Sequence, residues 1–356
     1  DEFNVDPALL RRLLVSRREQ GGRAVMLTTR EDQVLHLLAE GLDTTAIAAR
    51  LGISRNTCRG YVGALFGKLD CSLDIFLVEA LVNGLLLAGL LALLALGLNL
   101  VFGVVDVVWI CYAELVMVGM YCVWFLHTQA GWPLLAAFAA CLPVVAVLGL
   151  LLHQLVVRPL LGSPPITQVL ATGGVLFILQ GAAMLTFGTA FRSLGVEMPP
   201  MEIGEIFVSG TKLVAFVAAL VGAAVLWSFL KFTYVGTAIR AIARDREVMP
   251  LMGVNPRRIY LVASAIGGGL AGLAACLLVV QLDVHPFIGL SFGPITFMIC
   301  VMGGLGNMLG GFLAAFLMGV IISTGGFWWN TEMSYVVAFA CFIVVMFARP
   351  RGLFAR

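Results

Sequence analysis

The chain has 356 residues, of which 61% are hydrophobic and 12% charged, and its mean hydropathy is +1.02. This high share of apolar residues excludes a soluble globular protein and indicates an integral membrane protein. The formal net charge of +2 excludes a strong overall field that would attract nucleic acid or an acidic substrate.

Charged side chains are concentrated at the start of the chain. Residues 1–75 hold ten basic and ten acidic side chains, whereas residues 76–356 hold twelve and ten although this part is nearly four times as long. The sequence therefore divides into a polar segment, which we place at residues 1–72, and an apolar domain at residues 73–356.

Cysteine and histidine placement gives no sign of a disulfide framework or a metal site. Most of the eight cysteines stand inside apolar runs without CxxC spacing, and the four histidines are widely scattered. Metal sites need paired or clustered ligands, and disulfide scaffolds need a dense set of cysteines. We therefore expect the cysteines to be packing residues and expect no bound metal.

Residues 27–69 carry apolar side chains at helical spacing in three short runs. Capping residues stand at the expected helix ends: Thr28 or Thr29, Asp43 or Thr44, Gly52 and Ser54. Three short, closely spaced helices predict a helix-turn-helix segment.

The run LTTREDQVLHLLAEGLDTTAIAARLGISRNTCRGYVGALFGKL resembles the DNA-binding domain of the LuxR/NarL family, and the preceding VDPALLRRLL resembles a truncated linker of such regulators. The resemblance implies a recognition helix at about residues 54–69. The DNA contacts that it implies are Arg55, Asn56, Thr57 and Arg59. The alternative is a folded remnant that no longer binds DNA, because Gly60, Gly63 and Gly67 weaken the helix and the segment is electrically neutral.

Beyond residue 76 the chain is a series of apolar stretches, and about 20 apolar residues suffice to cross a bilayer. We expect spans near residues 76–102, 110–125, 133–157, 166–187, 212–230, 259–282, 287–302, 308–322 and 335–347. The second, seventh and eighth are short or interrupted by Gly and Pro, which predicts broken or re-entrant helices that are buried in protein or line a cavity. The expected fold class is an all-α, polytopic membrane helix bundle with a small N-terminal helix-turn-helix segment.

Basic loops set the expected orientation. Residues 231–258 and 349–356 are rich in Lys and Arg and belong in the cytoplasm, whereas the more acidic residues 188–211 belong outside. Nine spans then place the N-terminus outside, where a helix-turn-helix could not reach DNA. Either one short span is re-entrant, or the two parts of the chain are not used together.

The loop TYVGTAIRAIARDREVMPLMGVN, residues 233–255, predicts a short amphipathic cytoplasmic helix. Its apolar residues are Ile239, Ile242, Met249 and Leu251, basic side chains lie between them, and Gly253 closes it. Such a helix suits a docking surface. An ordinary basic loop is the alternative.

Residues 73–356 resemble the permease subunit of branched-chain amino-acid ABC importers. The resemblance rests on the loop above and on LVEALVNGLLLAGLLALLALGLNLVFGVV at 77–105, ITQVLATGGVLFILQGAAMLTFG at 166–188, VMGGLGNMLGGFLAAFLMGVI at 301–321 and RPRGLF at 349–354. It implies an inner-membrane protein that works with a second, related permease, two cytoplasmic ATP-binding subunits and a periplasmic substrate-binding protein.

The resemblance also implies a set of ATPase-coupling residues: Gly236, Arg240, Arg244, Asp245, Leu251 and Gly253. The chain itself contains no GxxxxGK[ST] phosphate loop, so we expect no cofactor in it and expect ATP to be used by the partner subunits. The glycine clusters at 267–272 and 303–311 include small-xxx-small spacings and predict close helix packing.

Few polar groups occur inside the spans, and each is costly there unless it is paired or faces a cavity. Where the family typically has Asn, His and Gly, this chain has Trp109, Tyr112 and Ala113, while Glu114 is kept. The substrate path is predicted to include Glu114, Tyr112, Trp109, Thr172 and Gln180. In the alternative, Glu114 pairs within the bundle, and Thr172 and Gln180 form interhelical hydrogen bonds.

The leading hypothesis is a permease subunit, not an enzyme, that imports branched-chain or related amino acids in an ABC system. A membrane-tethered transcription regulator is the alternative, in which the membrane domain is the sensor and DNA a partner only if the N-terminal segment is native and cytoplasmic. A facilitator without a motor fits poorly with a basic docking helix.

The junction between the two parts has two explanations. In one, the native permease begins near Leu73 and residues 1–72 are upstream regulator sequence joined by read-through or by an error in defining the gene. In the other, a true fusion continues the regulator's last helix into the first span.

Overall fold

The computed structural model describes residues 28–39, 42, 44–195, 201–203, 206–246, 248–328, 331–350 and 352–354. The chain divides into two compact units, Asp1–Glu79 and Ala80–Arg356. Nearly all described elements are helices, as expected for the all-α class. Two three-residue strands, β1 (Met201–Ile203) and β2 (Ile206–Val208), form a short antiparallel pair in which Glu202 faces Phe207. The expected truncated linker lies outside the described residues.

The first unit contains α2 (Thr29–Ala39), α3 (Thr44–Leu51) and the beginning of α4 (Arg55–Val105). The expected cap at Thr28 is confirmed, because the Glu31 carboxylate accepts hydrogen bonds from the Thr28 backbone N–H (2.7 Å) and hydroxyl (3.0 Å). A small apolar core joins the three helices through Val34, Ile47, Ala48, Cys58 and Val62. The three-helix prediction is thus confirmed, and Asp43 lies outside the described residues.

The junctions between these helices also follow the sequence. Gly52, with φ +67°, ends α3 in the left-handed conformation that glycine adopts without strain. Ser54 caps α4, because its hydroxyl accepts the Thr57 backbone N–H at 3.1 Å. The expected end of this helix near Leu69 is wrong, since α4 continues to Val105. Such a continuous helix is what the fusion explanation of the junction predicts.

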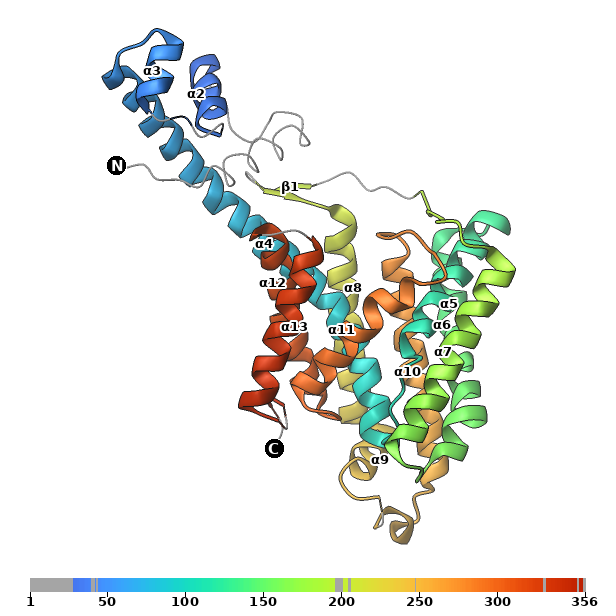
Figure 1. The fold of residues 1–356 in the computed structure, drawn as a ribbon. Coiled ribbons are helices and arrows are strands. Elements are labelled where there is room, and N and C mark those ends of the chain that lie inside the picture. Colours follow the sequence, from blue (N-terminus) through green and yellow to red (C-terminus); the bar gives the residue numbers. More distant parts are fainter. Residues whose placement is uncertain are drawn as a thin grey trace. The chain divides into compact units, whose positions relative to one another are not determined.

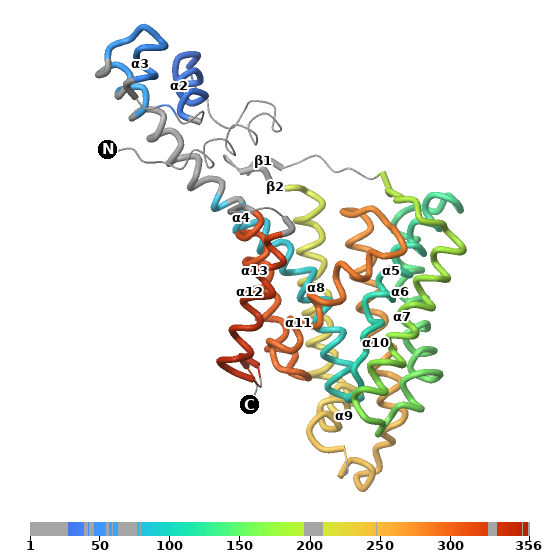
Figure 2. The backbone as a smooth tube through the Cα atoms, viewed as in Figure 1, coloured from blue at the N-terminus to red at the C-terminus, as the bar shows by residue number. Residues whose placement is uncertain are grey.

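The second unit is a bundle of helices (Figures 1 and 2). After α4 it contains α5 (Tyr112–Trp124), the π-helix η1 (Phe125–Gln129), α6 (Leu134–Leu152), the π-helix η2 (His153–Val157), the 3-10 helix η3 (Arg158–Leu160), α7 (Pro165–Phe187), α8 (Gly210–Phe232), α9 (Tyr234–Ile242), the 3-10 helix η4 (Met249–Met252), α10 (Pro256–Leu278), α11 (Ile288–Gly303), α12 (Met308–Trp328) and α13 (Thr331–Ala348).

Six stretches of the described residues are long and apolar enough to cross a bilayer, and the apolar helices 288–303 and 333–348 are shorter. All nine expected spans are helical. The second is the short α5, which follows an unwound stretch at residues 106–111 and continues as a π-helix. The seventh, α11, has 16 residues and contains Pro294. The eighth is longer than expected, because α12 extends to Trp328.

Glycines allow the closest helix contacts in the bundle, as their spacing predicted. A Cβ added to Gly268 of α10 would lie 2.7 Å from the Val145 carbonyl oxygen and 3.2 Å from Gly149 Cα, both on α6. A Cβ on Gly303 of α11 would lie 2.5 Å from the Gly310 carbonyl carbon at the start of α12. Since all these neighbours are backbone atoms, side chains are excluded at these crossings.

Helix α8 runs from one end of the second unit to the other. Lys212, near the first residue of α8, donates a hydrogen bond to the Asn83 side chain on α4 at 3.2 Å. The last residue of α8, Phe232, lies two residues before α9. A helix of 23 residues is about 34 Å long, so Asn83 and α9 lie at opposite ends of the unit. The chain therefore enters this unit at the end opposite to α9 (Figure 1).

Candidate functional site

A cavity of about 320 Å³ lies inside the second unit. It is bounded by Leu98 of α4, by the unwound stretch 108–110, by the start of α5, by α7 and by α11. The lining is almost entirely apolar, with these residues: Leu98, Val108, Trp109, Ile110, Tyr112, Ala113, Val169, Leu176, Gly289, Leu290, Gly293, Pro294, Thr296 and Phe297. A small ligand would fit this volume.

Two aromatic side chains from the predicted path line the cavity. Trp109 and Tyr112 are both buried, with ring centroids 6.1 Å apart and an interplanar angle of 62°. The Tyr112 hydroxyl donates to the Gly267 carbonyl oxygen on α10 at 3.2 Å, and Gly97 leaves room for it because a Cβ there would collide with that hydroxyl. Tyr112 is therefore held rigidly against α4 and α10.

Glu114 is completely buried beside the cavity. Its Oε1 accepts a hydrogen bond from Gln180 Nε2 of α7 at 3.0 Å. Gly289, a lining residue of α11, leaves room for the carboxyl group, since a Cβ there would lie 2.5 Å from Oε1. This contact with Gln180 is the pairing within the bundle that the alternative prediction for Glu114 describes.

Three buried polar atoms at or near the cavity have no hydrogen-bond partner among the described residues. They are Trp109 Nε1, Thr296 Oγ1 and Glu114 Oε2. Buried polar groups are normally satisfied, and an unsatisfied one costs about 1–3 kcal/mol. A ligand with hydrogen-bonding groups would remove this cost. The arrangement therefore suits a small molecule with an apolar body and a few polar atoms.

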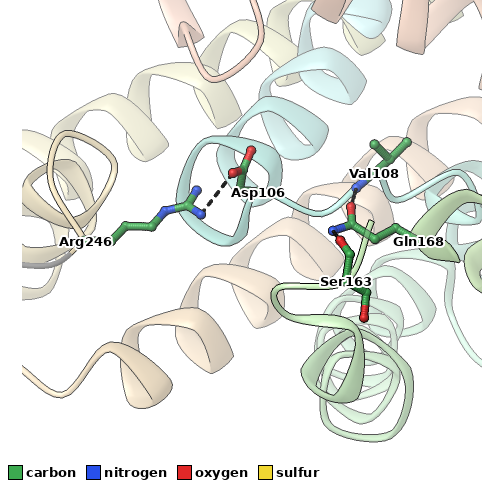
Figure 3. A network of polar contacts seen from close by, with 5 residues as sticks. All are labelled: Asp106, Val108, Ser163, Gln168 and Arg246. Carbon is green, nitrogen blue, oxygen red and sulfur yellow. Dashed lines mark hydrogen bonds and ion pairs between the residues drawn. The ribbon is translucent and has the colours of Figure 1, made fainter. Parts of the chain in front are cut away.

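Gln168 and Thr172, one turn apart on α7, contact the unwound stretch, and Figure 3 shows the contacts of Gln168. Gln168 Oε1 accepts the Val108 backbone N–H at 3.2 Å, and its Nε2 donates to the Ser163 carbonyl oxygen at 3.0 Å. The Thr172 hydroxyl lies 2.8 Å from the Gln168 carbonyl oxygen of its own helix and 3.0 Å from the Val108 carbonyl oxygen. Thr172 is not in the cavity lining, and its contact with Val108 matches the alternative prediction of an interhelical hydrogen bond.

Residue Asp106 begins the unwound stretch and is unusual in two ways. Among the described non-glycine residues it alone has a positive φ, of 59°. Its carboxylate forms an ion pair with Arg246 at 3.1 Å, which ties the end of α4 to the loop after α9 (Figure 3). Asp tolerates the left-handed region better than most residues.

The docking loop, residues 233–255, is built as two short elements rather than one helix. Helix α9 is capped by the Thr233 hydroxyl, which accepts the Gly236 N–H at 3.0 Å, and it buries Ile239 and Ile242 as predicted. Leu251 is 85% exposed in η4, so its expected place on the same apolar face is wrong. Turn residues 243–244 follow α9, and none of the residues of η4 is buried.

The other predicted coupling residues serve two purposes in this loop. Arg240 and Arg244 are exposed, and together with Leu251 they give the loop a surface of apolar and basic side chains. Asp245 closes the turn after α9 by accepting the Val248 N–H at 3.2 Å. Gly253, with φ +78°, ends η4 in the left-handed conformation. Such a surface fits a protein partner.

Of the predicted DNA contacts, the side chains of Arg55, Asn56 and Arg59 lie outside the described part of the structure. Thr57 is exposed, and its hydroxyl bonds Ser54 at 2.7 Å. Sequence reasoning missed Gln168, Thr296 and the Asp106–Arg246 pair. The interruption of the seventh span by Gly and Pro was the available signal for Thr296, because it pointed to α11 as a cavity-lining helix.

The fold and the cavity define a multi-pass helical membrane protein. Residues 80–346 match the family described as the permease component of branched-chain amino acid transport systems, and the chain belongs to this family. Residues 25–78 match the luxR family of bacterial regulatory proteins, so the expected N-terminal helix-turn-helix segment is confirmed as well.

Three curated relatives match most of this chain, two of them over nearly their whole length. The high-affinity branched-chain amino acid transport permease protein BraD of Pseudomonas aeruginosa is 30% identical over 78% of this chain and 96% of its own. The corresponding protein LivH of Escherichia coli is 25% identical over 79% and 96%. The protein LivM of the same bacterium is 26% identical over 73% of this chain and 67% of its own. All three are transport permeases.

Proposed function

We propose that this protein is a permease subunit of an ABC importer in the bacterial inner membrane, which carries branched-chain or related amino acids. The cavity carries this proposal, since it lies among the helices and combines an apolar lining with a few unpartnered polar groups. An amino acid with an apolar side chain presents the matching chemistry. The names of the relatives support this substrate class.

The docking loop supports the proposal that separate ATP-binding subunits drive transport. It exposes basic and apolar side chains at one end of the bundle, and the sequence has no phosphate loop of its own. Two cytoplasmic ATP-binding subunits would bind there, and a periplasmic binding protein would deliver the substrate at the other end. Two related permease proteins, LivH and LivM, are named for one transport system in Escherichia coli, which favours a second permease as partner here.

Uptake of labelled leucine tests the proposal. The chain is expressed together with a candidate second permease, ATP-binding subunits and a substrate-binding protein in a strain that lacks its own branched-chain amino acid uptake. We expect uptake that requires every subunit and stops when the phosphate-loop lysine of the ATP-binding subunit is replaced. Uptake that persists without the ATP-binding subunits would indicate a facilitator, and no uptake of any branched-chain amino acid would contradict the substrate class.

The side of the membrane on which each end of the second unit lies distinguishes the importer from a membrane-tethered regulator. Basic loops remain in the cytoplasm, so the docking loop should be inside and Lys212 outside. Because Asn83 lies with Lys212, the chain then enters the second unit from outside, which disfavours DNA binding in the same molecule.

Single cysteines at Lys212 and Arg240, in a background without native cysteines, test this sidedness. We expect a membrane-impermeant maleimide to label Lys212→Cys in intact spheroplasts and Arg240→Cys only after permeabilisation, because both side chains are exposed at opposite ends of the unit. The reverse pattern would place the docking loop beyond the reach of any ATPase. It would also revive the regulator, for which loss of DNA protection on changing Arg55 and Arg59 is the matching test.

A further inference from the structure

The unwound stretch 106–111 connects three features that are far apart in the sequence. Its first residue pairs with Arg246 of the docking loop, 140 positions away. Its third residue, Val108, is held by the side chains of Gln168 and Thr172 on α7. Its next residues, Trp109 and Ile110, line the cavity. Figure 3 shows the two polar contacts on either side of this short stretch.

We propose that the Asp106–Arg246 ion pair transmits movement of the docking loop to the cavity wall, an inference that rests on the proposed function. In this motion Val108 stays fixed against α7, and the residues on either side of it rotate about this point. When a partner displaces the docking loop, Arg246 draws Asp106 with it, and the segment turns about Val108. Trp109 lies on the other side of that point, so its indole moves relative to α11. Asp106 and Arg246 are positioning residues and touch no substrate.

Exposure and backbone geometry distinguish this role from a purely structural one. The side chains of Arg246 and Asp106 are 37% and 59% exposed. Ion pairs so exposed contribute little to stability, so loss of the pair should leave the protein folded. The positive φ of Asp106 is kept by Asn, which is also tolerated in the left-handed region. Asp106→Asn therefore removes the charge and leaves the backbone unchanged.

Coupling is measured with the full complex in proteoliposomes, as leucine transported per ATP hydrolysed. We expect Asp106→Asn and Arg246→Gln each to lower this ratio at least about 5-fold, the lower end of typical coupling effects. The double variant should be no worse than either single variant, because the same interaction is lost. Arg246→Lys should restore coupling, since its ammonium can pair with Asp106. Arg158→Gln, which removes an exposed arginine before α7, is the matched control and should couple normally.

Hydrogen exchange of the purified full chain supplies a readout that needs no partner subunit. We expect the amides of residues 107–111 to exchange at least about 5-fold faster in Asp106→Asn and Arg246→Gln, and unchanged in Arg158→Gln. Unaltered exchange, or wild-type coupling in both variants, would contradict the proposal that the ion pair transmits this movement. Failure of the wild-type complex to transport leucine would instead count against the proposed function.

Discussion

Replacing Gly236 by alanine is expected to displace helix α9 from the end of α8 and to lower leucine uptake about 5- to 150-fold. A Cβ at this position would lie 2.5 Å from Leu230 Cα and from the Phe229 carbonyl oxygen, and 2.6 Å from the Leu230 carbonyl oxygen. All three are backbone atoms at the end of α8, so no side chain can move aside to relieve the contact. Overpacking of this kind costs about 1–3 kcal/mol or more.

Helix α9 must shift to accept that methyl group, and its buried residues Ile239 and Ile242 would lose their packing. An energy of about 1–3 kcal/mol corresponds to about 5- to 150-fold in the population of the docked conformation. Co-purification of the ATP-binding subunits and leucine uptake measure the loss, while yield and gel-filtration profile report folding.

Gly181→Ala is the matched control for Gly236→Ala. Gly181 lies within α7, and a Cβ there meets nothing within 4 Å. We expect this variant to assemble and transport normally. If Gly236→Ala also bound the ATP-binding subunits as well as the wild type does, the close approach of α9 to α8 would not be needed for docking.

Replacing Glu114 by glutamine is expected to lower leucine uptake at least about tenfold, which corresponds to about 1.4 kcal/mol. Glutamine has nearly the same volume, and its side-chain oxygen can still accept the hydrogen bond from Gln180. Packing and the contact with α7 are therefore retained, and the carboxyl group alone is lost. The unpartnered Oε2 lies beside Gly289 of the cavity lining, because a Cβ on Gly289 would be 2.7 Å from it, and it is the group that a substrate could use.

Two further variants separate a path role of Glu114 from a packing role. Gln180→Ala removes the partner and leaves the carboxyl group, so a purely structural pair predicts that it lowers yield and uptake as much as Glu114→Ala does. A path role predicts a larger loss of uptake in both Glu114 variants at normal yield. Normal uptake by Glu114→Gln and Glu114→Ala in well-expressed protein would exclude Glu114 from the substrate path.

The helices were predictable because their signals are local. A bilayer requires about 20 apolar residues per span, so the hydrophobic stretches after residue 76 located the six long apolar helices and the two shorter ones among the described residues. The end of α12 was predicted too early, at residue 322 instead of Trp328, because the glycines near the end of the helix lower the apolar signal there. In the docking loop, helical spacing predicted the burial of Ile239 and Ile242. The same spacing failed for Leu251, because the turn at Asp245 interrupts the helix.

The roles of the polar residues were harder to predict. Of the five predicted path residues, Trp109 and Tyr112 line the cavity, whereas Glu114, Thr172 and Gln180 are not in its lining. Thr172 and Gln180 form the interhelical hydrogen bonds of the alternative prediction. Which face of α7 meets the unwound stretch depends on how helices cross, and a single sequence contains no local signal for that.

By itself, the sequence determined the membrane class, the positions of the apolar stretches and the basic loop, because each of these follows from composition or from short segments. Motifs within such segments carried the resemblance to the family. Only the tertiary structure decided which residues surround the cavity and which ion pair reaches it. Asp106 and Arg246 stand 140 positions apart, and their charges meet because α4 ends beside the loop that follows α9. Contacts of that kind arise from helix packing, which brings distant segments together after each has already formed.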